Sequence, residues 1–439
     1  MKSITMNLFL RRCFLFLALA GGTWAASAQT LRELTRLDAD LPPNAEAYAF
    51  SNERGALLLF QEGSQAQLLL LNPQLEVVRN FTVTDLPAPA DFDRLGFTFQ
   101  GGQLSICYRE RGTGLLQVIQ VNPEAGETEV FRLQDQLAGD LNWGTFTHEG
   151  ILHMVRVPRF GNEIRLCRFE GGGEFNAFAY PVPQGFTEQL AGGVQRLDSS
   201  NRAQLSTTYW PAKMYLYDGQ LYLTREDSGY TEVMHIDLAT REAQFHEHHL
   251  PDGTRLSNSL LLDDRLFQLG MSADSLFFGV SQVGDSLPLS QYRYHRAGLW
   301  RLREGPVVQR DPTGNQYLDL SSAEVSAAWD DAPHLALALT AQEEDRYLLA
   351  CGAVWPQRER GLSGAVIHEQ TRSLAFQSFL DIYSLQPVGP PAELIATNRF
   401  PPEYFQRAPL SLSFQLQQQR YWGYYDRQTG KFVLSVEER

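Results

Sequence analysis

Cysteine is scarce in this chain, and long apolar runs are almost absent. Three of its four cysteines, Cys107, Cys167 and Cys351, lie beyond the N-terminal 28 residues. An odd number of widely spaced cysteines does not form a disulfide framework. Each of the three lies in an apolar stretch, so we expect buried thiols that pack as small hydrophobic side chains. One disulfide is the alternative in an oxidising compartment.

The longest apolar run lies at the N-terminus. Residues 1–28 have basic side chains at positions 2, 11 and 12, an apolar run over 13–20 and the small-residue sequence ASA at 26–28. This pattern is typical of a cleaved signal peptide. The apolar run is too short for a membrane-spanning helix, which needs about 20 apolar residues. We therefore expect a secreted or periplasmic mature chain, residues 29–439, without a transmembrane segment.

Positive charge is in deficit, and lysine is rare. The chain has 37 Lys and Arg residues against 51 Asp and Glu residues, a formal net charge of −14. Such a surface repels phosphate backbones, which excludes nucleic acid as an expected partner. Lys2, Lys213 and Lys431 are the only lysines, a bias that we interpret as genome composition.

Catalytic signatures are also lacking. The sequence contains no G-x-S-x-G elbow, no P-loop and no G-x-G-x-x-G fingerprint. The sequence HEHH at 246–249 lacks the HExxH spacing, and we interpret it as a polar outer strand on which His246 and His248 share one face. The acidic pair at 330–331 lacks the spaced acids of a calcium loop and is interpreted as a solvated turn. We therefore predict no catalytic residue, no metal site and no cofactor.

A repeat dominates what the sequence does contain. Four segments, 46–83, 94–133, 142–182 and 212–250, each have two apolar strands joined by a tight polar turn, a third apolar strand and a more charged fourth strand. Pairs such as Gly101-Gly102 and Asp218-Gly219 are typical of such hairpin turns. The step between the first three starts matches the about 40–50 residues of a four-stranded propeller blade.

The pattern predicts an all-β fold, a β-propeller of seven four-stranded blades, with six or eight blades as the alternatives. Looser blades follow at 257–294, over 334–340, 346–354 and 374–385, and at 410–436. The last of them has only three strands. The N-terminal strand 30–38 resembles the outer strands, so we expect it to complete the last blade and close the ring. Residues 29–439 would then form a single propeller domain.

Four insertions interrupt the period, at 183–211, 304–332, 355–373 and 386–409. Long connections of this kind are often functional. Tyr209, Trp210, Trp329 and Trp355 lie in or beside them, and exposed aromatic side chains there could stack on sugars or anchor a peptide. The alternative is that these rings pack in the core or cap the blades.

Two segments resemble a known family. The opening blade, FSNERGALLLFQEGSQAQLLLLNPQLEVV at 50–78, and the closing hairpin, YWGYYDRQTGKFVLSV at 421–436, are similar to signal-peptide-bearing, β-propeller-like proteins of Bacteroidetes-type bacteria. SNSLLLDDRLFQLGMSADSL at 257–276 is a weaker match. The resemblance implies secretion and an all-β fold, and it brings no activity, cofactor or catalytic residue.

These observations favour a non-enzymatic binding or scaffold propeller that recognises a protein or a glycan through loops on one face. The first alternative is a hydrolase or lyase that acts on sugars or lactones, with acids from several inner strands meeting at the central channel. The second alternative is a structural component of a cell-envelope complex. Acids or a metal in the channel would favour the enzyme, and apolar filling would favour the binding protein.

Overall fold

The chain was analysed as a computed structural model. The structure describes residues 31–37, 45–135, 137, 139–169, 175–190, 193–197, 204–227, 229–285, 287–296, 304–311, 314–342, 346–360, 366–388, 411–417, 419–426 and 431–437. The expected signal peptide lies outside these residues, as does most of the insertion 386–409. Within the described part, no helix is both long and apolar enough to cross a membrane.

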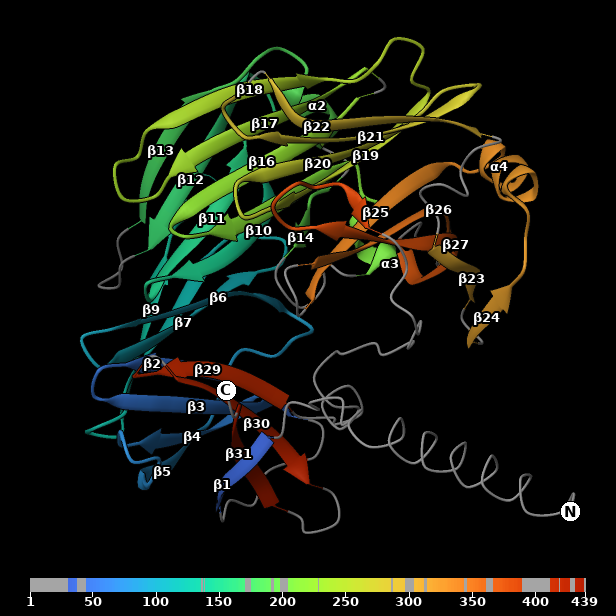
Figure 1. Ribbon diagram of the computed structural model, residues 1–439. Coiled ribbons are helices and arrows are strands. Elements are labelled where there is room, and N and C mark those ends of the chain that lie inside the picture. The colour runs from blue at the N-terminus through green and yellow to red at the C-terminus, as the bar shows by residue number, and fades with distance from the viewer. Residues whose placement is uncertain are drawn as a thin grey trace, which may run out of the picture. The chain divides into compact units, whose positions relative to one another are not determined.

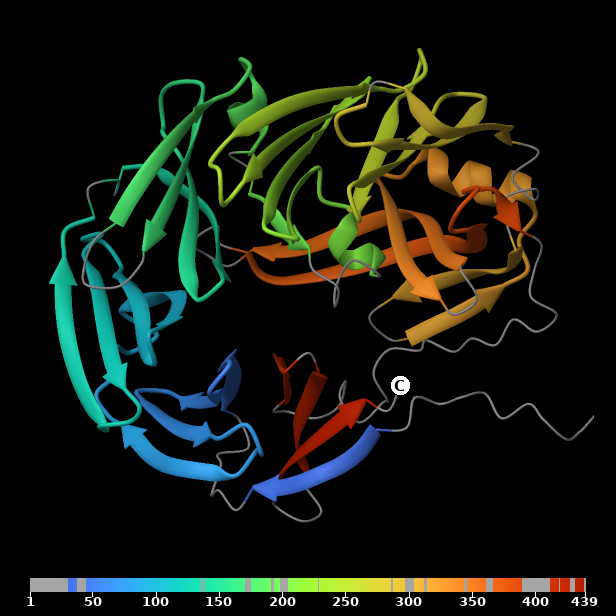
Figure 2. The ribbon, with the colours of Figure 1, turned by 60° about the vertical axis from the view of Figure 1, so that its left-hand side comes forward.

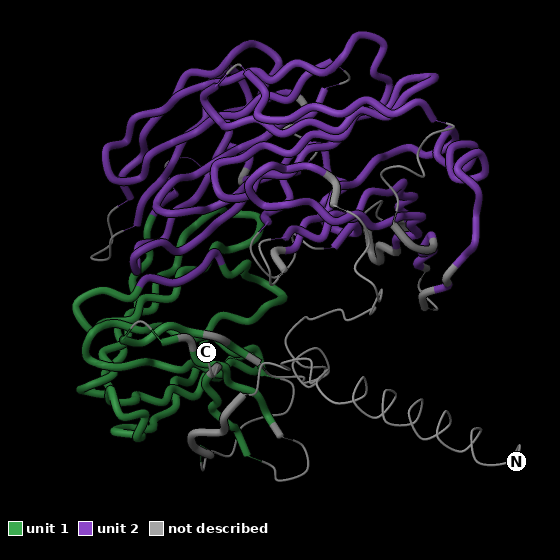
Figure 3. The backbone as a smooth tube through the Cα atoms, viewed as in Figure 1, with its two compact units in different colours: residues 1–94, 99–133, 398–439 green, residues 95–98, 134–397 purple. Residues whose placement is uncertain are grey.

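The fold is all-β and of the propeller class. Seven successive antiparallel sheets are each built on four strands, and two of them carry additional strands (Figure 1). The prediction of seven four-stranded blades is therefore confirmed. Two compact units divide the chain, residues 1–94, 99–133 and 398–439 as unit 1 and residues 95–98 and 134–397 as unit 2 (Figure 3).

Unit 1 contains three of the sheets, with residues 95–98 of one strand grouped in unit 2. Their strands, in sheet order, are β2 (Glu46–Asn52), β3 (Gly55–Glu62), β4 (Gln65–Leu71) and β5 (Val77–Val83); β6 (Phe92–Gln100), β7 (Gln103–Glu110), β8 (Leu116–Asn122) and β9 (Glu127–Leu133); and β29 (Ser411–Leu416), β30 (Gln419–Asp426), β31 (Lys431–Glu437) and β1 (Leu31–Leu37).

The N-terminal strand completes the last of these sheets. β1 pairs antiparallel with β31, from Leu31 opposite Glu437 to Leu37 opposite Phe432, so that the two chain ends share one sheet (Figure 2). Leu37 is buried with the aromatic and aliphatic side chains of this sheet and of β2–β4. The predicted N-terminal strand of the last blade is thereby confirmed, and closure of the whole ring stays a prediction.

Unit 2 contains the other four sheets. Their strands, in sheet order, are β10 (Leu141–His148), β11 (Ile151–Val157), β12 (Glu163–Phe169) and β13 (Phe175–Pro181); β14 (Gln195–Leu197), β15 (Ala212–Tyr217), β16 (Gln220–Glu226), β17 (Tyr230–Asp237) and β18 (Ala243–His249); β19 (Leu256–Leu262), β20 (Arg265–Met271), β21 (Ser275–Gln282) and β22 (Pro288–His295); and β25 (His334–Gln342), β26 (Arg346–Arg360), β27 (Val366–Asp381), β23 (Glu304–Asp311) and β24 (Gly314–Leu318), with β28 (Pro387–Val388) beside β27.

The sixth sheet differs from the expected arrangement. The sequence assigned three strands to this blade, and its fourth strand, β23, comes from the predicted insertion 304–332 that precedes the inner strand. Val307 of β23 is fully buried, which explains why this segment joins the sheet. The insertion 355–373 is likewise not a loop, because β26 and β27 continue through most of it as a paired hairpin.

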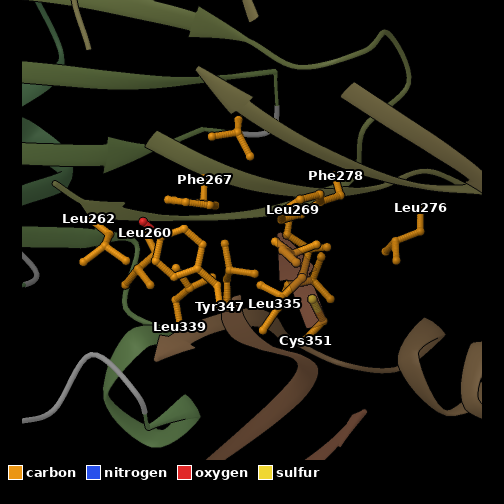
Figure 4. Packing of buried hydrophobic residues seen from close by; sticks show 14 of the residues in the cluster. Leu260, Leu262, Phe267, Leu269, Leu276, Phe278, Leu335, Leu339, Tyr347 and Cys351 are labelled. Carbon is orange, nitrogen blue, oxygen red and sulfur yellow. The ribbon is translucent and has the colours of Figure 1, made fainter. Parts of the chain in front are cut away.

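Burial follows position within each sheet. Seven of the eight residues of β3 are buried, whereas most of β5 is exposed. A middle strand such as β3 is covered on both faces by neighbouring sheets, whereas the first strand, β2, is half-buried along most of its length and the outer strand faces solvent on one side. In unit 2, Phe267 of β20 meets Tyr347 of β26 edge to face, with ring centroids 5.8 Å apart, in a shared aliphatic core (Figure 4).

Within the described residues, three short helices lie in the connections, α2 (Phe186–Leu190), α3 (Leu205–Thr208) and α4 (Ser322–Asp330). α4 begins with a capping box in which Ser321 and Glu324 each bond the other's backbone N–H. The cysteines Cys107, Cys167 and Cys351 are buried and free, as the first interpretation expected. Burial raises the pKa of the Cys167 thiol to about 11, so this thiol stays protonated at neutral pH and is a poor nucleophile.

Candidate functional site

The connections of unit 2 gather at one end of its sheets. In each sheet the first strand begins and the second strand ends at the same end, because consecutive strands are antiparallel. We call this end the loop edge of unit 2. It comprises the described residues of 158–162, 182–194, 204–211, 227–229, 250–255, 272–274, 296 and 319–333, together with the ends of β26 and β27 that extend through 355–373. Parts of three predicted insertions therefore lie at this edge.

One insertion also covers the inner strands of unit 2. We call its described residues 193–197 and 204–211 the covering segment. Its strand β14 pairs in parallel with β15, which places Gln195 beside Lys213. The Arg196 guanidinium donates to the carbonyl of Thr145 on β10 at 3.3 Å.

The same segment reaches the other two sheets. The Asn258 amide on β19 donates to the carbonyl of Thr208 at 3.1 Å, and Tyr209 packs with Ala336 of β25 and Val354 of β26. Each of the four sheets in unit 2 therefore contacts the covering segment. At these contacts the covering segment shields the inner strands, so their side chains are not freely accessible.

Carboxylates are rare on the inner strands. Among β2, β6, β10, β15, β19, β25 and β29, only Glu46 and Asp93 are acidic, and both belong to unit 1. Each carboxylate is ion-paired, Glu46 with Arg94, and Asp93 with Arg111 at 2.8 Å. The described inner strands of unit 2 therefore provide no set of acids for general acid–base chemistry.

Tyr209 and Trp210 end the covering segment. Tyr209 is only 2% exposed, and its ring lies 5.3 Å from the ring of His334 and 5.7 Å from that of Trp210. The structure thus places Tyr209 in the packed interior, which corresponds to the capping alternative. Trp210 is half-buried at the loop edge and keeps part of its surface accessible.

Trp329 and Trp355 belong to the other two insertions and differ in exposure. Trp329 of α4 is 1% exposed and stacks on Phe376 at 5.5 Å, with its indole N–H donating to the carbonyl of Leu374. A buried indole has no face available to a ligand. Trp355 is half-buried and is therefore the more accessible of the two, although the guanidinium of Arg372 lies over one face of its ring.

In the acidic pair at 330–331, Asp330 is held by two arginine side chains. Asp330 accepts from Arg255 at 3.0 Å and from Arg296 at 2.7 Å, and the Arg296 bond lowers the pKa of this carboxyl. Arg296 also donates to the carbonyl of Ser326 in α4. These bonds fasten α4 to the fifth sheet and leave the carboxylate paired with cations.

A buried polar seam joins the fourth and fifth sheets below the loop edge. Lys213, fully buried, pairs with Glu226 at 3.1 Å. The carboxylate of Glu226 also accepts from the backbone N–H of Ser259 at 2.7 Å and from the hydroxyl of Thr231 at 3.0 Å. Burial lowers the pKa of Lys213, and the ion pair with Glu226 opposes that effect.

The seam continues to the outer strand. The Gln268 amide donates to Thr231 at 3.0 Å and to the carbonyl of His248 at 3.1 Å. The His248 ring is hydrogen-bonded through Nδ1 to Ser281 at 3.0 Å. Burial lowers the pKa of His248 to about 4, with the neighbouring His246 adding to the shift. Composition did not identify this seam, although Lys213 stands out as one of only three lysines.

The histidines at 246–249 lie on β18, the outer strand of its sheet, as predicted. Among the described residues, no group of three or more His, Cys, Asp or Glu side chains is arranged to hold a metal ion. His248 instead packs inward against Ser281, and His249 pairs outward with Glu247 at 3.1 Å. The acidic run 343–345 lies outside the described residues.

The loop edge also holds an open cavity of about 580 Å³, lined by the described residues among 229–230 and 249–254. Tyr230 and His249 meet there edge to face at 6.3 Å. Phe160, in the turn between β11 and β12, is 91% exposed. Sequence reasoning missed Phe160, and the signal for it was an apolar ring within a polar turn, next to Arg159 and Gly161.

Similarity to known proteins extends only to solved structures, since no protein-family model and no curated protein matches the sequence. A mutant apocarotenoid oxygenase from Synechocystis aligns with a TM-score of 0.31 and 10% identity over 57% of this chain and 62% of that chain. The WD40 domain of SCAP from fission yeast aligns with a TM-score of 0.31 and 10% identity over 93% of this chain and 97% of that chain. The chain thus spans about three fifths of the length of the oxygenase structure. TM-scores of this size support no conclusion about function.

Proposed function

We propose that this chain is a secreted or periplasmic β-propeller protein that binds a protein partner, without catalysis, through the loop edge of unit 2. The observation that carries the proposal is the 91% exposure of Phe160 on that edge. A large apolar ring held in solvent costs hydration free energy, which is recovered when a partner covers it.

Two further features of the edge support binding. Trp210 and Trp355 are half-buried there, so each has a fixed ring with an accessible part. Aromatic side chains anchored in this way lose little conformational freedom when a partner binds. The cavity beside Tyr230 and His249 offers a concave complement on the same edge.

The hydrolase or lyase alternative has less support. It requires acids from several inner strands, and the described inner strands carry only Glu46 and Asp93. Hydrogen bonds from Tyr48 and Arg94 lower the pKa of Glu46, so this carboxyl is ionised at neutral pH and holds no proton to donate. The covering segment contacts the inner strands of unit 2, where a channel site would have to form.

A photo-crosslinking experiment tests the proposal. A photoreactive phenylalanine analogue is placed at Phe160 in the full chain, expressed in the native cell, and adducts are identified by mass spectrometry. The matched control places the analogue at Tyr383, which is 75% exposed and follows the far end of β27 in the same unit.

We expect one reproducible protein adduct from position 160 and none from position 383, and we expect Phe160→Ala to weaken the purified complex at least tenfold. Equal adducts at both positions, or none at 160, would contradict the proposal. Adducts to many envelope proteins at both positions would favour the structural-component alternative. Binding on a glycan array that is lost in Phe160→Ala would make the ligand a glycan.

A further inference from the structure

A second cavity, of about 440 Å³, lies wholly within unit 1 and involves none of the insertions. It opens between the first two sheets, where β2 begins, β3 ends and β6 begins. Its size falls within the about 300–1,000 Å³ that is typical of small-molecule sites. The lining residues are Glu46, Gln61, Glu62, Gly63, Pro87, Pro89, Phe92, Asp93, Arg94, Tyr108 and Arg111.

One wall of this cavity is apolar and held rigidly. It consists of Pro87, Pro89 and the half-buried ring of Phe92. Proline removes backbone freedom from the connection. The connection is also tied at both ends, by the bond from the Leu86 N–H to Ser64 and by that from the Phe92 N–H to Ala88, at 2.9 and 3.0 Å. The wall is therefore formed before any ligand arrives.

The facing wall is a network centred on Arg94. Its guanidinium donates to Gln61 at 2.9 Å, to the carboxylate of Glu46 and to the hydroxyl of Tyr48. It also lies over the Tyr48 ring, 4.6 Å from its centre. The Gln61 amide in turn donates to the hydroxyl of Tyr108 at 3.3 Å. This network offers carboxylate, amide and phenol groups in fixed positions.

The rim is polar as well. Arg111 donates from Nε to Asp93 at 2.8 Å and from Nη1 to the carbonyl of Ala90 at 3.2 Å. Arg109 approaches the other oxygen of Asp93 at 3.4 Å. Asp93 and Arg111 at the rim thus pair with each other, as Arg94 and Glu46 do in the facing wall. Glu62 also lines the cavity, is exposed, and has no ion pair among the described residues.

Four of the five charged lining side chains, all except the exposed Glu62, are held in ion pairs, and these pairs determine which ligands the cavity suits. An anion would have to compete with Glu46 for Arg94, and a cation would have to compete with arginine for Asp93. A neutral ligand with hydroxyl groups can donate to the carboxylates and accept from the guanidinium groups without breaking either pair. A sugar ring has such hydroxyls along its edge and a C–H face that suits proline and phenylalanine.

We propose that the unit 1 cavity is a binding site for a small neutral saccharide. The site is separate from the loop edge, and its test does not depend on the protein partner proposed above. Phe92 and the prolines contact the C–H face of the sugar ring. Arg94, Asp93 and Tyr108 bond its hydroxyls.

Isothermal titration calorimetry on the mature chain, residues 29–439, tests the site. The probes are glucose, galactose, mannose, N-acetylglucosamine, maltose and cellobiose, with glucuronate as the anionic analogue, glucosamine as the cationic analogue and triglycine as a neutral amide. We expect at least one neutral sugar to bind, and we expect glucuronate and glucosamine to bind at least tenfold more weakly than their neutral counterpart.

Variants at the cavity wall and rim localise the binding. Phe92→Ala and Arg111→Gln should each weaken the sugar at least tenfold, while the thermal transition stays within a few degrees of the parent. Arg79→Gln is the matched control, because Arg79 is exposed on β5 and bonds only the nearby carbonyl of Ala125 among the contacts described for it. It should leave sugar binding unchanged.

Several results would overturn the proposal. They are the absence of heat with every neutral sugar at tens of millimolar, tighter binding of glucuronate, glucosamine or triglycine, and sugar binding that survives both Phe92→Ala and Arg111→Gln. The Phe160→Ala variant should bind sugar as tightly as the parent. Loss of the saccharide proposal can therefore be told apart from loss of the protein-binding proposal at the loop edge.

Discussion

At the residue scale, the least expected feature is a lysine with no solvent contact. Lys213 sits beside Glu226 with 0% exposure, in a chain that uses arginine for nearly every other cation. A buried ion pair often adds little net stability, because both charges lose their hydration. Removing one partner is costly, since the other charge is then buried alone.

We therefore expect Lys213→Met to lower the free energy of unfolding by about 3–5 kcal/mol at pH 7. Urea denaturation followed by fluorescence measures the change. Adding Glu226→Gln to this variant should recover part of the loss, because the remaining buried group is then neutral. Lys431→Met, at a half-buried position on β31, should cost less than about 1 kcal/mol. Equal effects of the two lysine variants would contradict this reading of the seam.

Two buried histidines make stability depend on pH. Burial lowers the pKa of His153 and of His248 from 6.5 to about 4. Below pH 6.5 the unfolded chain takes up protons at these positions while the folded chain does not, so stability is complete above pH 6.5 and is lost as the pH falls toward 4. The loss should approach about 1.4 kcal/mol per pH unit for each histidine.

Urea denaturation between pH 7 and pH 4 measures this dependence. His248→Gln should make the pH profile shallower over that window, whatever its cost at pH 7. His249→Gln is the control, because that side chain is 74% exposed. A profile that is the same in the parent and in His248→Gln would show that the buried ring does not determine the acid response.

At the element scale, position within a sheet decides how much each strand contributes. Middle strands such as β3 are buried on both faces, and outer strands such as β5 are mostly exposed. β1 is an outer strand that arrives from the far end of the sequence, and its pairing with β31 covers an edge that would otherwise lie open.

We expect Leu37→Ala in β1 to cost about 2–5 kcal/mol, because Leu37 is 3% exposed and packs in the core of the last sheet. Thermal denaturation of the mature chain measures it. Val78→Ala on the outer strand β5 is the comparison, since Val78 is 62% exposed, and it should change stability by less than about 0.5 kcal/mol. A neutral Leu37→Ala would mean that β1 does not stabilise its sheet.

At the scale of the whole molecule, an insertion has become part of the core of unit 2. The covering segment pairs with β15, accepts a bond from Asn258 and buries Tyr209 against Ala336. A segment that contacts all four sheets of a unit should stabilise their inner strands together.

Hydrogen–deuterium exchange tests that role. Tyr209→Ala removes a buried ring and should speed amide exchange in β15 and in β25, which lie in different sheets. Phe160→Ala removes an exposed ring and should leave both strands protected. Faster exchange confined to residues next to 209 would show that the covering segment does not link the sheets.

Local pattern was enough to predict much of this architecture. The all-β fold, the four-stranded modules, the pairing of the N-terminal strand and the exposed outer strand with the HEHH sequence all follow from apolar periodicity and turn residues, which act within a few positions of the chain. Each strand alone would expose an apolar face, so its sequence already indicates that it must pack against neighbouring strands.

Only tertiary structure decided which insertion residues are buried. Trp329 and Trp355 both lie in or beside predicted insertions, yet one is stacked in the core and the other is partly accessible. The seam from Lys213 to Ser281, the network around Arg94 and the strand β23 likewise join residues far apart in the chain. Contacts of this kind depend on which sheets lie next to each other, and the local pattern of a single sequence does not indicate which distant residues come together.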